Sequence, residues 1–231
     1  SKNAVLTRFN SKLTLKKLNL PKPRFGEVLV KIKYSGVCKS QLMEIKGYRN
    51  TKKWLPHLLG HEGSGKVVDV GSGVKKVKKN DEVILTWIKS KGINCNGGKI
   101  KNSNQLINFG PITTFGEYSL ISENRIIKKP TYIDSKIAAL FGCALPTGFG
   151  MVLNETKLKK KDKILIFGVG GIGYSAIIMA LSMGLKNITV LEKNKFKLKI
   201  AKKLPVKKIF NINNKKNYNK FKKENLGYFD V

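Results

Sequence analysis

The sequence predicts an α/β protein with a β-rich first part and an incomplete, doubly wound parallel sheet in its second part. In the first half of the 231 residues, short runs of alternating apolar and polar residues are separated by glycine and proline, which is the period of half-buried strands. From Asp134 the period becomes helical. After residue 163, apolar runs alternate with helical patterns, as in β-α-β units. We expect two domains, residues 1–144 and 145–231.

The expected strands of the first domain are short, and we expect them to form a small, barrel-like set. Pro21, Pro23 and Gly26 mark the turn between the second and third strands. The expected strand runs are residues 4–9, 12–18, 27–37, 63–74, 81–88 and 116–130. Residues 89–108 are rich in glycine, asparagine and lysine, so they are interpreted as a long surface loop.

The second part begins with a helical pattern from Asp134 to Cys143, followed by an expected turn at 145–148 and a second helix. Three buried strands, a glycine turn and two helices are then expected, and the chain stops at 227–231 in what resembles the start of a fourth strand. The strand runs are residues 163–167, 187–192 and 207–212, and the two later helices end at Gly184 and near Leu204. Because such a sheet needs about six strands, we expect this chain to be a fragment of a longer protein.

The net charge of +32 has two interpretations. One is a surface for nucleic acid or a membrane. The other, which we favour, is a compositional bias, because of 46 basic residues only Arg8, Arg24, Arg49 and Arg125 are arginine. Specific nucleic-acid binding usually depends on arginine. We therefore expect no specific nucleic-acid partner, only nonspecific attraction of polyanions.

The cellular location is predicted from the lack of a membrane-spanning run and a signal peptide in this sequence, and from the number and spacing of its cysteines. No run of about 18 apolar residues is present to cross a membrane, and the first residues do not form a signal peptide. The three cysteines, Cys38, Cys95 and Cys143, are odd in number and widely spaced, which argues against a disulfide framework. We expect a cytoplasmic protein without a membrane partner.

A glycine pattern in the second part predicts a dinucleotide site. Residues 168–173 read Gly-x-Gly-x-x-Gly between an apolar strand and a helix, and an acidic residue follows 19 positions later (192 − 173). Such glycines allow a pyrophosphate to approach the helix N-terminus, and the acidic residue can accept hydrogen bonds from a ribose. The carboxylate favours NAD(H) over NADP(H), although Lys193 weakens that preference; the alternative is a glycine turn needed only for packing. The candidate residues are Gly168, Gly170, Gly171, Gly173 and Glu192.

Two cysteines and a histidine are candidates for a metal site. Cys38, His61 and Cys143 offer two thiolates and one imidazole, which leaves one position open on a tetrahedral zinc, as in catalytic rather than structural sites. Such a zinc can act as a Lewis acid on an alcohol or carbonyl. Taken singly, each residue also has an ordinary explanation, namely a buried thiol or a satisfied polar group.

Four motifs together resemble the medium-chain, zinc-dependent alcohol dehydrogenases. They are "GVCKS", "LLGHEGSGKVVDVGSGVKKVKKNDEV", "GCALPTGFG" and "GVGGIG", in the order of that family. The resemblance covers essentially the whole chain. It implies a GroES-like, partly open β-barrel as the catalytic domain, followed by a Rossmann domain, and hydride transfer between an alcohol or carbonyl compound and NAD(H).

The resemblance also implies roles for individual residues. Cys38, His61 and Cys143 would bind the catalytic zinc, and Glu62 would lie behind it and tune it. Ser40 would take the proton of the alcohol. Lys39 would face the cofactor phosphates, and Thr147 would touch the nicotinamide side. The implied ligands are one zinc ion, NAD, and a small alcohol or aldehyde, and the full-length parent would be a homo-oligomer.

The chain departs from the family pattern in three places. The loop that often carries a structural zinc has only Cys95, so we expect no structural zinc. Met43 stands where some members have a proton-relaying histidine; His57 is an alternative relay, although its position favours packing. The remainder of the Rossmann domain, which in the family completes the nicotinamide pocket, is missing.

Other functions remain open from the sequence. One is a zinc-independent quinone or enone reductase of the same superfamily. Another is a noncatalytic basic protein derived from a dehydrogenase. A third is an inactive fragment that binds polyanions nonspecifically.

Overall fold

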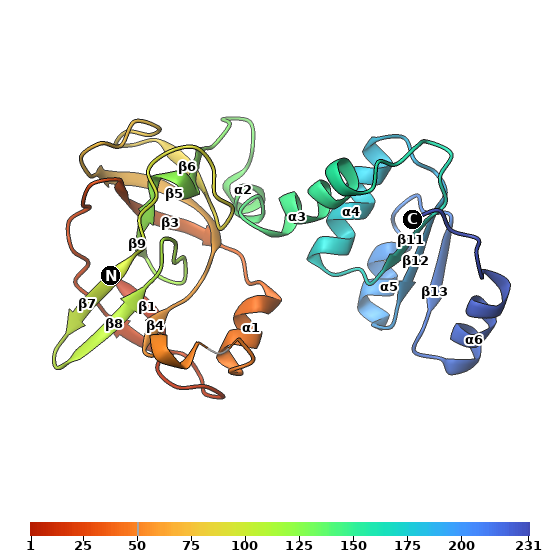
Figure 1. Ribbon diagram of the computed structural model, residues 1–231, viewed down its shortest axis with the longest axis horizontal. Helices are drawn as coiled ribbons and strands as arrows, with labels where there is room; N and C mark the ends of the chain where they lie inside the picture. The colour runs from red at the N-terminus through yellow and green to blue at the C-terminus, as the bar shows by residue number, and fades with distance from the viewer. Residues whose placement is uncertain (50) are drawn as a thin grey trace. The chain divides into compact units, whose positions relative to one another are not determined.

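The computed structural model (Figure 1) describes residues 1–49 and 51–231. The chain divides into two compact units, Ser1–Cys143 and Ala144–Val231. This division lies one residue from the boundary expected from the sequence. The assignment of the units as a catalytic and a dinucleotide-binding domain stays a prediction.

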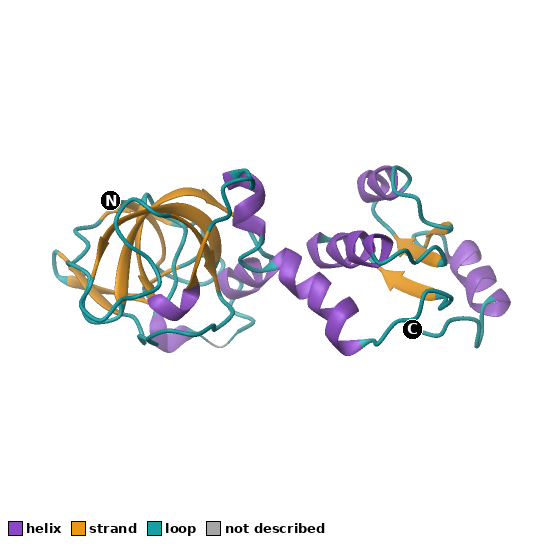
Figure 2. Ribbon diagram, turned by 90° about the horizontal axis from the view of Figure 1, so that it is seen from above, coloured by secondary structure: helices purple, strands orange, loops and turns teal. Residues whose placement is uncertain are grey.

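The first unit consists of two five-stranded sheets, ordered β2-β1-β4-β8-β7 and β10-β6-β5-β3-β9. Seen from above in Figure 2, its strands curve around a shared interior. The strands are β1 (Lys2–Leu6), β2 (Thr14–Lys17), β3 (Glu27–Ser35), β4 (His57–Leu58), β5 (Glu62–Val70), β6 (Glu82–Thr86), β7 (Gly98–Asn102), β8 (Gln105–Phe109), β9 (Tyr118–Ser122) and β10 (Ile126–Lys128). This is the β-rich, partly open barrel predicted for the first part.

Alternating strand residues build the interior of this unit. Val28 and Val30 of β3 are fully buried and pack with Val83 and Leu85 of β6. A second cluster under the other sheet includes Ile107 of β8. The period-2 pattern seen in the sequence therefore corresponds to one buried face on each sheet.

The described residues of the first unit also form four short helical segments. They are α1 (Lys39–Ile45), η1 (Lys52–Trp54), η2 (Glu123–Arg125) and α2 (Ser135–Leu140). The side chain of Asp134 caps α2 by accepting the Lys136 amide at 2.8 Å. Gln41 is the buried residue of α1, and Glu44 and Ile45 of this helix also contact the rest of the unit, through His57 and through the backbone amide of Asn10.

The prediction of a long surface loop at residues 89–108 is wrong for residues 98–108. Residues 98–109 form the hairpin β7–β8, with five paired positions and a turn in which Ser103 has φ 52°. Only Ile100, Ile107 and Phe109 are buried in it. Because polar residues occupy most other positions, the alternation is too sparse to be recognised as a strand pattern.

The second unit contains a three-stranded parallel sheet, β11-β12-β13, formed by Ile164–Phe167, Ile188–Glu192 and Lys208–Asn211. Figure 2 shows helices on both sides of it. All five residues of β12 are buried, as expected for the middle strand. The helices are α3 (Ala144–Gly150), the π-helical η3 (Met151–Glu155), α4 (Gly171–Ser182), α5 (Lys195–Ala201) and α6 (Lys215–Glu224). The predicted fold class, an incomplete doubly wound sheet after a β-rich part, is confirmed.

Two local expectations for the second unit are wrong. Residues 145–148 lie inside α3 rather than in a turn; Pro146 is the third residue of that helix, where its missing N–H needs no intrahelical acceptor. The last residues form no strand, although the Leu165 amide donates to the Val231 carbonyl at 2.8 Å.

Of the helices in the described part of the chain, none combines the length and apolar character needed to cross a membrane.

Candidate functional site

The structure brings Cys38, His61 and Cys143 together in the first unit, with their ligand atoms all within 4.8 Å of one another. We call these three residues the trio. Tetrahedral coordination at Zn–S and Zn–N distances of about 2.3 and 2.0 Å separates ligand atoms by roughly 3.5–3.8 Å. Only a small closure is therefore needed for one zinc to reach all three. The donor set fits zinc, because two thiolates and one imidazole are the ligands it prefers.

The sheet explains why residues so distant in sequence meet. β3 ends just before Cys38, and β5 starts just after His61. These strands are antiparallel neighbours, with Ser35 opposite Gly63, so both ends lie at one edge of the sheet. β6, on the other side of β5, ends at the same edge and holds the Cys143 segment, because the Thr86 hydroxyl donates to the Gly142 carbonyl at 2.8 Å.

The ring of His61 is held by the buried amide of Gln41. Nδ1 of His61 lies 2.9 Å from Nε2 of Gln41, while Oε1 of Gln41 accepts the Gly60 N–H at 2.6 Å. Burial lowers the pKa of His61, the charge of Arg49 lowers it further, and Glu44 opposes them. A lowered pKa keeps the imidazole neutral near pH 7, the form that binds metals.

Glu62 directly follows His61 and is 2% exposed. Two glycines make room for it: a Cβ at Gly36 would lie 2.6 Å from Glu62 Cδ, and one at Gly142 would lie 2.6 Å from its Cβ. The Glu62 carbonyl accepts the Ser35 hydroxyl at 3.1 Å and the Gly36 amide at 3.2 Å. The sequence interpretation overlooked Gly36 and Gly142. Gly36 lies two residues before Cys38, and Gly142 directly precedes Cys143. This closeness to the two candidate ligands was the signal in the sequence that could have identified both glycines.

The other predicted catalytic residues lie on α1 or close to it. The Ser40 Oγ is buried and makes no hydrogen bond within the described residues. Lys39 is exposed, and Met43 is 40% exposed. His57 is buried, and its Nε2 lies 3.1 Å from Glu44 Oε1, an ion-pair distance without hydrogen-bond alignment. His57 lies beside Glu44 and lines the cavity described below, so its role as a relay or as a packing residue stays a prediction.

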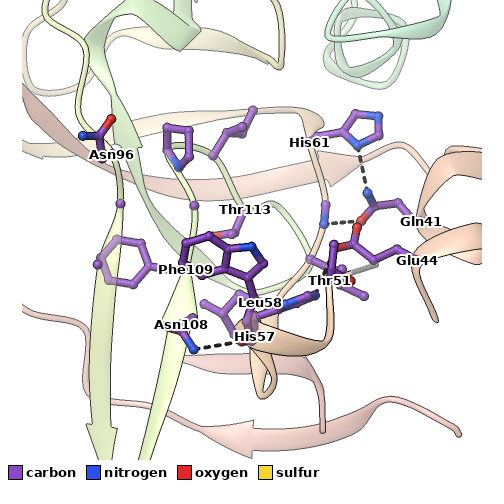
Figure 3. Close-up of a pocket in the computed structure, with 18 of the residues that line it drawn as sticks. Gln41, Glu44, Thr51, His57, Leu58, His61, Asn96, Asn108, Phe109 and Thr113 are labelled. Atoms are coloured by element: carbon purple, nitrogen blue, oxygen red, sulfur yellow. Dashed lines mark hydrogen bonds and ion pairs between the residues drawn. The ribbon is translucent and has the colours of Figure 1, made fainter. Parts of the chain in front are cut away.

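A cavity of about 770 Å³ lies beside His61 within the first unit (Figure 3). Gln41 and Glu44 line it on the side of α1, and Trp54 also lines it, whereas Trp87 is not part of its wall. Its remaining wall comes mainly from β4, β8 and the segments 96–99 and 110–113. The cavity offers both apolar and polar surface next to a candidate metal ligand.

The loop that holds Cys95 is fixed by a carboxylate and a hydroxyl. Glu123 accepts the amide of Ile93 at 2.8 Å and those of Lys75 and Lys76 at 2.6 and 2.9 Å. The Ser122 hydroxyl accepts the Cys95 amide at 2.8 Å. These groups anchor the loop at the place where a structural zinc was considered; the absence of that zinc stays a prediction.

The predicted dinucleotide turn belongs to the second unit. Gly168 has φ 84°, a conformation that favours glycine, and a Cβ at Gly173 would collide with the Gly168 carbonyl oxygen. The turn ends at Gly170, the N-cap residue, and Gly171 is the first residue of the 12-residue helix α4. Backbone amides at this helix start are therefore available to an anionic ligand. Thr147 lies in α3 of the same unit, whereas Lys39 belongs to the first unit.

Glu192 closes the turn from the end of β12. It is 5% exposed, and Oε2 accepts the Val169 amide at 2.7 Å. Oε1 accepts the amides of Lys193 and Asn194 at 2.7 and 2.8 Å. Burial alone would raise the pKa of Glu192, but these hydrogen bonds and the charge of Lys197 lower it. The sequence predicted a ribose acceptor here; the carboxylate also fixes the glycine turn.

Comparison with known proteins identifies several similar chains. A family described as "Alcohol dehydrogenase GroES-like domain" matches residues 24–131. An alcohol dehydrogenase from Moraxella sp. (strain TAE123) is 35% identical over 219 residues, covering 92% of this chain and 64% of that protein.

Two solved structures have a similar fold. An alcohol dehydrogenase zinc-binding domain protein from Burkholderia ambifaria has a TM-score of 0.83 at 25% identity, covering 92% of this chain and 64% of that one. Benzyl alcohol dehydrogenase from Acinetobacter calcoaceticus has a TM-score of 0.81 at 25% identity, covering 96% and 67%. The chain thus spans 64% of the length of the Moraxella protein and 64% and 67% of the two solved structures.

Proposed function

Because the chain belongs to the medium-chain alcohol dehydrogenase family, we propose that it carries the zinc and NAD sites of an enzyme that transfers a hydride between an alcohol and NAD(H). The observation that carries this proposal is the convergence of Cys38, His61 and Cys143 within 4.8 Å at one edge of the sheet.

Zinc would be held by the two thiolates and by Nε2 of His61, because Nδ1 faces the Gln41 amide at 2.9 Å. When bound, it would supply Lewis-acid stabilisation of negative charge on the oxygen of the alcohol or carbonyl substrate. Glu62, which lies close to Gly36 and Gly142, would stand behind the ion, add negative charge near it and tune its acidity. The three ligands leave one position of a tetrahedral site for the substrate.

Ser40 would accept the proton of the alcohol. Ser40 lies two residues after Cys38, and its hydroxyl oxygen is buried and makes no hydrogen bond in the described part of the chain, so it is available to a ligand. Met43 cannot carry the proton onward, since a thioether has no transferable proton. The proton would therefore leave through hydroxyl groups of the cofactor or through water.

The glycine turn and Glu192 would bind the dinucleotide. Backbone amides at the start of α4 would hold the pyrophosphate, with Gly168, Gly170, Gly171 and Gly173 keeping side chains out of its path. The carboxylate of Glu192 favours a ribose hydroxyl over a 2′-phosphate, which supports NAD(H) as the cofactor. Thr147 and Lys39 are proposed to contact the nicotinamide side and the phosphates.

The cavity beside His61 would receive the carbon chain of the alcohol. Trp54 and Phe109 give it apolar surface, and Glu44 and Asn108 give it polar surface. The volume of about 770 Å³ is sufficient for a substrate larger than ethanol.

Metal and cofactor analysis tests the proposal. Purified chain, expressed with zinc in the medium and dialysed, is expected to contain one zinc per chain and to enhance NADH fluorescence. Protein that binds NADH without zinc would instead indicate the zinc-independent reductase branch of the family. Protein that binds neither would contradict the proposed function.

A further inference from the structure

Gln41 makes the contact that sets the orientation of the His61 ring. It is the buried residue of α1, 5% exposed, and its side chain reaches from the helix to the Gly60-His61 turn (Figure 3). Its two amide atoms contact two neighbouring residues, with Oε1 2.6 Å from Gly60 N and Nε2 2.9 Å from His61 Nδ1.

The donors and acceptors around Gln41 determine the orientation of its side-chain amide. The Gly60 N–H can only donate, so it must face the oxygen of Gln41. The NH₂ of Gln41 then faces His61 Nδ1, and because NH₂ can only donate, Nδ1 must accept. In a neutral ring, the proton is then on Nε2.

This arrangement opposes metal binding through the free ring nitrogen. A metal at Nε2 takes the lone pair of that nitrogen, so the neutral ring must carry its proton on Nδ1. That Nδ1–H would face the NH₂ of Gln41. Because both groups are donors, no hydrogen bond could form between them. Turning the amide over merely moves the conflict to Gly60, since one amide oxygen cannot occupy both positions. A carboxylate at position 41 would offer an acceptor oxygen to each donor.

From these contacts, and resting on the proposed zinc site, we infer that Gln41 is a positioning residue that weakens zinc binding by holding His61 in the tautomer that a metal must displace. Gln41→Glu should therefore bind zinc more tightly than the native chain. Partners of metal-bound histidines typically change metal affinity about 10- to 100-fold, and a gain of that size is expected here.

The test measures zinc affinity by competition with a chromophoric chelator, using the 231-residue chain. Leu42→Glu is the matched control, because it adds the same charge to α1 at a residue that is 51% exposed. A gain for Gln41→Glu well above that for Leu42→Glu supports the inference. Equal affinities for the two variants would overturn it, because charge alone would then explain the effect.

A second readout does not depend on affinity. With only two histidines in the chain, ¹⁵N NMR of the metal-free protein, assigned with a His57→Asn variant, reports which ring nitrogen of His61 is protonated. We expect Nε2–H in the native chain and Nδ1–H in Gln41→Glu. Native protein with Nδ1–H would overturn the inference while leaving the zinc site intact. Failure of every variant to bind zinc would instead overturn the proposed function.

Discussion

The carboxylate of Glu192 accepts the backbone N–H of Val169 at 2.7 Å, and so joins the end of β12 to the glycine turn after β11. With the amides of Lys193 and Asn194, the carboxylate receives three backbone hydrogen bonds while 5% exposed. A residue expected to recognise a ribose therefore also determines the shape of the turn. Cofactor recognition and the stability of the second unit should consequently change together.

Glu192→Gln is expected to destabilise the chain by about 1–3 kcal/mol, because an amide nitrogen would face at least one backbone donor and leave it buried without an acceptor. NADH affinity should fall in the same variant. Glu224→Gln is the matched control, since the ion pair of Glu224 with Lys220 is long, at 3.7 Å, and exposed, and its loss should change stability little. Urea unfolding and NADH fluorescence measure both effects; unchanged unfolding of Glu192→Gln would contradict the anchoring role.

Stability should fall at acid pH through Glu27. This side chain is 3% exposed and accepts three hydrogen bonds from Arg24, two from the guanidinium at 2.6 and 3.1 Å and one from the backbone amide at 2.9 Å. Burial would raise its pKa, but the hydrogen bonds and charge of Arg24 lower it overall. A lowered pKa contributes stability that is fully present above the unfolded value, near 4.3, and is lost as pH falls through the folded value. Urea unfolding from pH 7 to 3 should show this loss, and Glu27→Gln should show a smaller one.

Gly36→Ala should disturb Glu62. The new Cβ would lie 2.6 Å from Glu62 Cδ, too close for any ordinary contact, so the carboxylate must move. Overpacking of this kind costs about 1–3 kcal/mol, and zinc affinity should fall with it. Gly150→Ala is the control, because its nearest neighbour would be 3.7 Å away and its helical φ of −62° suits alanine. Thermal unfolding and zinc titration decide; equal behaviour of the two variants would rule out the role of Gly36.

The sequence predicted the residues whose chemistry is carried by their type. Cysteine, histidine and a spaced glycine pattern are recognisable without a structure, so the trio and the turn at residues 168–173 could be found. Strand patterns likewise predicted β3, β5 and β12; burial is complete along β12 and partial along β3 and β5.

The sequence could not predict features that arise from contacts between distant segments. A glutamine is not recognisable as a site residue from its type alone, and the role of Gln41 depends on its contact with Gly60, 19 residues away. The hairpin β7–β8 was missed because its exposed face is rich in lysine and asparagine, residues typical of loops. The helix around Pro146 was mistaken for a turn because proline and glycine are ambiguous near helix starts.

The last prediction concerns Cys143, and Cys95 of the same chain provides its control. Cys143 is buried among the trio, whereas Cys95 lies in the loop held by Glu123 and Ser122, with its thiol 3.4 Å from the Phe25 carbonyl. Cys143→Ala removes one of the three proposed zinc ligands and should abolish stoichiometric zinc after dialysis. Cys95→Ala should retain one zinc per chain. Metal analysis of both variants, with circular dichroism to verify folding, is the measurement. Retention of zinc by a folded Cys143→Ala chain, or its loss from a folded Cys95→Ala chain, would show that the metal is bound elsewhere.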